Sequence, residues 1–157
     1  MFRLFRTFRL LPLLALVAIT LVVPSAAMAA PSDDAARVVE LVNAQRAAHG
    51  LPALRWEGRL AASAADYAVQ MAQTGLFNHW EQDGASMVQR DEAHGYTDWS
   101  FLGENLARDK ATPEDVVAAW MASPTHLANL LAIDACQIGV GQANASSVNY
   151  WAMETGC

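Results

Sequence analysis

The sequence lacks the short motifs that would by themselves assign it a chemistry. No two of its four histidines stand at the i, i+4 spacing of a helical metal motif. No serine or cysteine stands in a recognisable nucleophile motif, and there are no internal repeats. These absences make an enzyme a less favoured expectation. Any functional site must then be formed by residues that come together only in the folded chain.

The sequence also has no apolar run of the length that crosses a membrane. Its long apolar run, Leu10–Val23, has 14 residues, whereas a spanning helix needs about 20. Three arginines precede this run, and a stretch of small residues follows it. We predict a signal peptide over residues 1–29, cleaved after about Ala29, and a secreted, extracytoplasmic protein with no membrane span after cleavage. The alternative is an uncleaved N-terminal anchor.

Basic residues are scarce once the signal peptide is removed. Arg3, Arg6 and Arg9 account for three of the ten basic residues, so residues 30–157 keep seven against 16 acidic ones, a net charge of −9. Such a surface does not suit phosphate backbones or anionic lipids, and we expect no nucleic-acid partner. The remaining 128 residues suffice for one domain with a buried core, which we expect to be a monomer.

Only two cysteines, Cys136 and Cys157, are present, and both lie in the exported part. An oxidising compartment lets a disulfide persist there. We expect a bond between them that ties down the C-terminus and contributes roughly 3 kcal/mol in the chain-entropy model. A catalytic thiol is the alternative, but Cys157 is the last residue and Cys136 has apolar neighbours.

Helix caps and apolar periodicity predict helices first and a hairpin last. The predicted helices span about 33–49, 57–74 and 87–94, and further helices begin at 113 and 124. The predicted strands span about 102–106, 137–143 and 148–153, the last two joined by a turn. This order indicates an α+β fold rather than a wound parallel sheet.

Two histidines and one carboxylate are the candidates for chemistry. His49 and His94 each precede a glycine at a predicted helix end, where capping explains them. His79 follows the second predicted helix and His126 lies in the last one, with Glu104 between them in the sequence. Glycine, asparagine and apolar residues surround Glu104, and a buried acid must be paired to stay ionised. We therefore expect a cationic group to face Glu104.

Seven segments occur in a fixed order over nearly all of residues 35–153. They are LVNAQR at 41–46, LRW at 54–56, FNH at 77–79, GENLA at 103–107, AWMASPTHLANL at 119–130, IGVG at 138–141 and YW at 150–151. Each is modest alone, but the ordered set resembles bacterial, single-domain secreted members of the CAP superfamily (cysteine-rich secretory protein, antigen 5 and pathogenesis-related 1). By this resemblance, residues 30–157 form one CAP domain, also called an SCP domain.

The resemblance implies a three-layer α-β-α sandwich with a small, mainly antiparallel sheet. It also implies a surface cleft in which two histidines and one or two acids converge and can hold zinc or another divalent metal. By position, these residues are His79, Glu104 and His126. An open metal position beside them would activate water. The alternative is a structural cluster in which Glu104 hydrogen-bonds a histidine and pins the loops.

The sequence departs from the family at the second acid. The resemblance places that acid two residues before Trp120, where this chain has Ala118. Glu114 lies one helical turn earlier and is the candidate to replace it, although the helix dipole already explains an acid in the first turn.

Three functions compete on this evidence. The favoured one is a secreted binding module whose cleft takes a small molecule, a lipid or sterol-like ligand, or a protein partner. The second is a divalent-metal-dependent hydrolase that uses His79, Glu104 and His126, with Glu104 as a ligand or general base. The third is a structural envelope protein, which would show a cleft without convergent polar groups.

Overall fold

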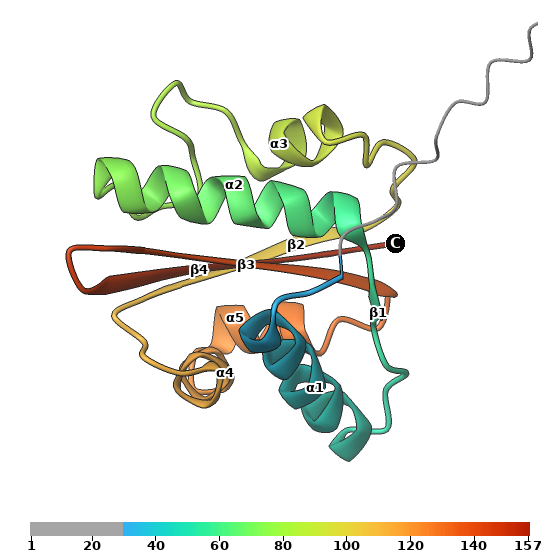
Figure 1. Cartoon of the computed structure of the whole chain (residues 1–157). Helices are drawn as coiled ribbons and strands as arrows, with labels where there is room; N and C mark the ends of the chain where they lie inside the picture. Colours follow the sequence, from blue (N-terminus) through green and yellow to red (C-terminus); the bar gives the residue numbers. More distant parts are fainter. Residues whose placement is uncertain (1–29) are drawn as a thin grey trace, which may run out of the picture.

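The computed structural model describes residues 30–157, in which helices cover both faces of a sheet (Figure 1). The predicted signal peptide, residues 1–29, lies outside the described residues. Helices α2 and α3 cover one face, and α1, α4 and α5 cover the other. The predicted α-β-α sandwich is confirmed. The helices are α1 (Asp33–Ala48), α2 (Gly58–Thr74), α3 (Met87–Ala93), α4 (Pro113–Met121) and α5 (Pro124–Leu130).

The strands form one mainly antiparallel sheet in the order β1-β3-β4-β2. Strand β1 (Arg55–Trp56) pairs in parallel with β3 (Gln137–Ala145), and β4 (Val148–Gly156) pairs antiparallel with both β3 and β2 (Leu102–Arg108). The predicted hairpin is therefore present, but its strands are longer than predicted. Ser146 and Ser147 make the whole turn, each with positive φ, as tight hairpin turns require.

The predicted caps fix where the helices begin. Ser32 caps α1, Ser86 forms a complete capping box with Gln89 on α3, and Thr112 caps α4. Each cap side chain accepts a hydrogen bond from a backbone N–H that the helix leaves unpaired. Helix α2 ends at Gly75, which adopts the left-handed conformation with φ 71°.

Helix α2 lies unusually close to the sheet because β3 carries glycine where the two meet. A Cβ atom on Gly139 would come within 2.1 Å of the Ala61 backbone nitrogen, and one on Gly141 within 2.3 Å of the Ala65 nitrogen. Only the absence of a side chain permits this approach. The alanines of α2 complete the contact, and the end of α2 thereby lies over the sheet near β2.

The larger apolar core lies on the other face of the sheet. Trp120 of α4 and Trp151 of β4 are fully buried there, together with Val38, Val42 and Ile138. Within residues 30–157, no helix is long and apolar enough to cross a membrane.

The two cysteines are bonded to each other at the C-terminal end of the sheet. The Cα atoms of Cys136 and Cys157 are 5.1 Å apart. The Cys157 backbone also exchanges hydrogen bonds with the segment before β2, since its N–H donates to the Phe101 carbonyl at 3.1 Å. The chain end is thus fastened by a disulfide and by backbone pairing.

Candidate functional site

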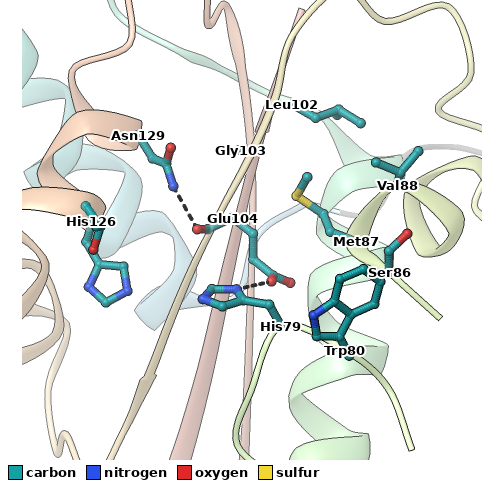
Figure 2. A pocket seen from close by; sticks show the side chains of 11 residues that line it. His79, Trp80, Ser86, Met87, Val88, Leu102, Gly103, Glu104, His126 and Asn129 are labelled. Atoms are coloured by element: carbon teal, nitrogen blue, oxygen red, sulfur yellow. Dashed lines mark hydrogen bonds and ion pairs between the residues drawn. The ribbon is translucent and has the colours of Figure 1, made fainter. Parts of the chain in front are cut away.

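A cleft of about 410 Å³ opens between α3 and α5, beside the edge strand β2 (Figure 2). His79, Glu104 and His126, the three predicted site residues, all line it. They come from the loop after α2, from β2 and from α5, so only the fold brings them together. The prediction that these side chains converge on one cleft agrees with this geometry.

The loop that carries His79 is anchored to the buried face of α2. The Tyr67 hydroxyl donates to the Asn78 backbone carbonyl and also lies 3.2 Å from the Trp80 carbonyl. Tyr67 itself is buried between α2 and the sheet. These bonds hold the residues on both sides of His79, so the imidazole position is determined by the core.

His79 and Glu104 form a short hydrogen bond at the base of the cleft. The His79 Nδ1 lies 2.6 Å from the Glu104 Oε1. This bond raises the pKa of His79 and outweighs burial, which lowers it. The His79 side chain is 57% exposed, and Figure 2 shows its second ring nitrogen turned away from Glu104, toward the side where His126 lies. That nitrogen is available to a ligand.

Glu104 is itself buried, and its carboxylate contacts an imidazole and a guanidinium. Its side chain is 4% exposed. One carboxylate oxygen bonds His79, and the other accepts a hydrogen bond from Nη2 of Arg90 on α3. The expectation that a cationic group faces Glu104 is confirmed, although the sequence did not identify Arg90 as that group.

A second buried acid lies directly beside Glu104. Glu154 on β4 is its cross-strand partner and is fully buried. Burial raises the pKa of Glu154 well above its usual range, and the negative charges of Glu104 and Asp91 raise it further. Burial thus favours the neutral form of Glu154, so that it can lie directly beside Glu104.

His126 lies in α5, on the opposite wall of the cleft, and two asparagines fasten α5 to β2. The Asn129 amide donates to the Glu104 backbone carbonyl, and the Asn105 amide donates to the His126 backbone carbonyl, both at 2.9 Å. Burial lowers the pKa of His126, and the nearby His79 lowers it further. The pKa values of the two imidazoles in the cleft are therefore shifted in opposite directions.

Glu114 and Ala118 lie outside this cleft. Both line a separate hollow between α1 and α4. The Glu114 carboxylate instead accepts a hydrogen bond from Nε of Arg37 on α1 at 2.8 Å. The prediction that Glu114 replaces a missing acid is therefore wrong, because this side of α4 faces α1 rather than β2. An acid at position 118 would share that orientation.

The described residues do not fit the three-ligand zinc site that the resemblance implies. Within residues 30–157, no group of three His, Cys, Asp or Glu side chains is arranged to hold a metal ion. Both oxygens of Glu104 are in addition already bonded, one to His79 and the other to Arg90. Two imidazoles remain, one fewer than the three protein ligands of a catalytic zinc site.

Sequence reasoning missed Arg90 and Glu154. Arg90 stands in a short polar helix, where a solvated side chain is the ordinary expectation. A signal did exist for Glu154, because it follows the apolar run Tyr150–Met153 directly. The predicted strand ended at Met153, and one more residue would have placed an acid inside a buried strand.

The sequence is similar to proteins of an established family. A model of the cysteine-rich secretory protein family, CAP, matches residues 39–154. The chain is 35% identical over 112 residues to the protein YkwD of Bacillus subtilis (strain 168), a match that covers 71% of this chain and 43% of YkwD. This chain therefore spans less than half the length of that relative.

Two solved structures share the fold. An extracellular protein containing an SCP domain from Bacillus anthracis superposes with a TM-score of 0.72 and 22% identity, over 78% of this chain and 40% of that one. An outer surface protein from Borrelia burgdorferi gives a TM-score of 0.70 and 22% identity, over 76% of this chain and 88% of that one. These likenesses show the fold, and the family match spans His79, Glu104 and His126. The chain belongs to the cysteine-rich secretory protein (CAP) family.

Proposed function

We propose that this domain is an extracellular binding module whose cleft between α3 and α5 takes a small amphiphile, with an apolar body and an oxygen-bearing head group. One observation carries the proposal. A single cleft combines an exposed, oriented imidazole at His79 with an apolar wall. Binding sites for small molecules commonly combine an apolar lining with a few fixed polar groups.

The apolar wall consists of Trp80, Met87, Val88 and Leu102. Trp80 is 59% exposed, which is a large apolar surface for a side chain that covers no core. Methionine adapts its shape to different ligands, and tryptophan offers a wide flat contact. Together they suit an aliphatic chain or a fused ring system such as a sterol.

His79 supplies the polar end of the cleft. When it is protonated, Nδ1–H donates to Glu104 and the second N–H is left for an acceptor oxygen of the ligand. Because Arg90 holds Glu104 in place, the imidazole cannot turn without breaking its hydrogen bond to this fixed carboxylate. A carboxylate head group would gain the most, since charge-assisted hydrogen bonds are the stronger ones.

An extracellular location is part of this proposal. The N-terminal segment has the pattern of a signal peptide, the cysteines are paired, and two structural relatives are described as an extracellular and an outer surface protein. Outside the cell, such a cleft would capture lipids or other amphiphiles from the surroundings.

The other two functions find less support in the geometry. The metal-dependent hydrolase needs three ligands, and among residues 30–157 Glu104 is already occupied by Arg90 and His79. The structural envelope protein predicts a cleft without convergent polar groups, whereas His79, Glu104 and His126 converge here.

The proposal is tested with two probes that share a twelve-carbon chain. Residues 30–157, labelled with ¹⁵N, are titrated with dodecanoate and with dodecyltrimethylammonium, both below their micelle concentrations. Saturable shifts with dodecanoate should map to Trp80, Met87 and Val88, and His79→Ala should weaken binding at least about tenfold, the cost of a charged hydrogen bond. His49→Ala, an exposed histidine at the end of α1, is the matched control.

Three results would count against the proposal. Binding of both probes with equal affinity would remove the role of His79. Shifts confined to the hollow between α1 and α4 would move the ligand to another site. The absence of saturable binding for either probe would leave an amphiphile without support.

A further inference from the structure

Arg90 carries a buried positive charge, which its neighbours must compensate. Its side chain is 3% exposed, and a guanidinium cannot lose its proton. Nη2 donates to Glu104 and lies 3.6 Å from the Glu154 carboxyl, and Nε lies 3.8 Å from the Glu81 carboxylate. The guanidinium carbon also lies 3.6 Å from the centre of the Tyr67 ring. Three carboxyl groups and one aromatic face thus surround a single cation.

A second buried arginine shows what a purely structural role looks like. Arg46 of α1 donates to the backbone carbonyls of Pro52, Leu130 and Ala132 at 2.8 to 2.9 Å, and so ties three loop and helix ends together. Arg90, by contrast, finds no hydrogen-bond partner for Nε or Nη1 anywhere in residues 30–157. It meets acids instead of carbonyls, and only one of its contacts is a hydrogen bond. Its main contribution is therefore charge.

We propose that the Arg90 guanidinium replaces the divalent cation that the family resemblance implies, and that it fixes His79 for the ligand by holding Glu104. A metal ion in a protein neutralises converging carboxylates and orients the imidazoles bonded to them. Arg90 does both here, since it neutralises Glu104, and Glu104 in turn orients His79. Arg90 is a positioning residue, because it reaches the cleft through Glu104.

The groups around Arg90 are of the kinds that bind a metal ion, and the guanidinium lies where the ion would be. Removing the guanidinium would leave Glu104, Glu154 and Glu81 around a void, with His79 at its border. Carboxylate oxygens and imidazole nitrogen are the ligands that zinc accepts. We expect the Arg90→Ala variant to acquire a zinc site that the wild-type protein lacks. This expectation holds whatever molecule the cleft binds, so it does not depend on the proposed function.

Zinc calorimetry at neutral pH tests the inference on residues 30–157. The wild-type protein should show no saturable binding attributable to His79. Arg90→Ala should bind one zinc ion at least tenfold more tightly than the wild type, and Arg90→Ala with His79→Ala should lose that gain. Arg90→Lys, which keeps a cation in place, is the matched control and should behave like the wild type.

A second readout follows His79 without any metal. In the wild type, the ¹⁵N chemical shifts of the His79 ring should show one nitrogen held in a hydrogen bond throughout the titration. In Arg90→Ala the ring should become mobile and titrate closer to an ordinary histidine. Arg90→Lys should restore most of the wild-type behaviour.

Loss of Arg90 also leaves the surrounding carboxyl groups without their cation. The Arg90→Ala, Glu154→Gln double variant removes one of these groups as a safeguard for folding. If either variant is unfolded without metal, circular dichroism should show it folding as zinc is added. The inference is overturned if wild-type protein binds zinc through His79 as tightly as Arg90→Ala does. It is equally overturned if neither variant gains zinc affinity nor zinc-dependent folding.

Discussion

The two faces of the sheet differ in what they bury. The face under α1, α4 and α5 buries large apolar side chains, among them Trp120 and Trp151. The face under α2 and α3 combines glycine and alanine contacts along β3 with the buried charges around Arg90. Strand alternation produces this split, because Glu154 points to one face and its neighbour Met153 to the other.

This difference assigns separate tasks to the two faces. Burial of apolar area stabilises a fold without specifying a chemistry, so the tryptophan face supplies the stability. Buried charges cost free energy unless they are paired, and they define where neighbouring side chains must lie. The charged face therefore holds the loop and strand residues that build the cleft. Substitution of the buried tryptophans should reduce stability most, and substitution of the buried charges should also affect protonation, ordering and binding.

The largest expected effect is on the apolar face. Trp120→Ala should reduce the free energy of unfolding by about 3–5 kcal/mol, because it opens a cavity in the core. It also removes the indole N–H that donates to the Leu106 carbonyl at 3.0 Å. Urea unfolding monitored by circular dichroism measures the loss. Trp80→Ala, the same change at the exposed rim of the cleft, should cost less than about 1 kcal/mol. An equal loss of stability in Trp120→Ala and Trp80→Ala would contradict the division between the faces.

The sequence predicted the apolar face more completely than the charged one. The start of helix α4 was predicted from its cap, because the signal for a helix start is local. Strand β1 was not predicted, since two residues give no periodicity and its pairing with β3 depends on segments about eighty residues apart.

The sequence predicted only part of the candidate site, because the other part depends on contacts between segments far apart in the chain. His79, Glu104 and His126 were found through the resemblance, and the cleft brings them together. Arg90 was missed because its burial depends on how α3 packs over α2, which no local pattern records. Glu114 was wrongly assigned because a residue count does not reveal which neighbour a helix face meets.

The charged face should make stability depend on pH through Asp91. Burial raises the pKa of Asp91 to about 6, against the opposing effects of Ser63 and Arg90. The folded state therefore holds this proton more tightly than the unfolded state, whose carboxyl has a pKa near the ordinary value of 3.8. Stability from this group is complete below about pH 4 and is lost as the pH rises through about 6.

The size of this effect follows from the shift. About two pKa units correspond to at most about 3 kcal/mol. Urea unfolding at pH 4 and pH 8 should show the wild type losing up to that much more than Asp91→Asn between the two conditions. Asp134→Asn, at an exposed carboxyl, should follow the wild type. An identical pH response in wild type and Asp91→Asn would show that Asp91 does not cause this dependence.

The glycine contact between β3 and α2, on the same face, gives a smaller effect. Gly141→Ala places a Cβ about where the α2 backbone lies, with 2.3 Å to the Ala65 nitrogen. Helix and strand must separate, and overpacking of this kind costs typically about 2 kcal/mol. Thermal unfolding measures the loss, and Gln142→Ala, the exposed neighbour on β3, should change stability by less than about 0.5 kcal/mol. Wild-type stability in Gly141→Ala would show that α2 can move off the sheet at no cost.

The smallest effect compares one cap on each face. Ser86 caps α3 on the charged face and Thr112 caps α4 on the apolar face, and each accepts from the backbone N–H three residues later, at Gln89 and Asp115. Replacing either by Ala should cost about 1 kcal/mol.

Because α3 is short and held over the cleft by charged contacts, Ser86→Ala should raise hydrogen exchange about fivefold within α3 alone. Thr112→Ala should instead lower global stability, because α4 opens only when the tryptophan core does. Exchange measured by mass spectrometry separates these outcomes, and a global response to Ser86→Ala would mean that the cleft wall and the core unfold as one unit.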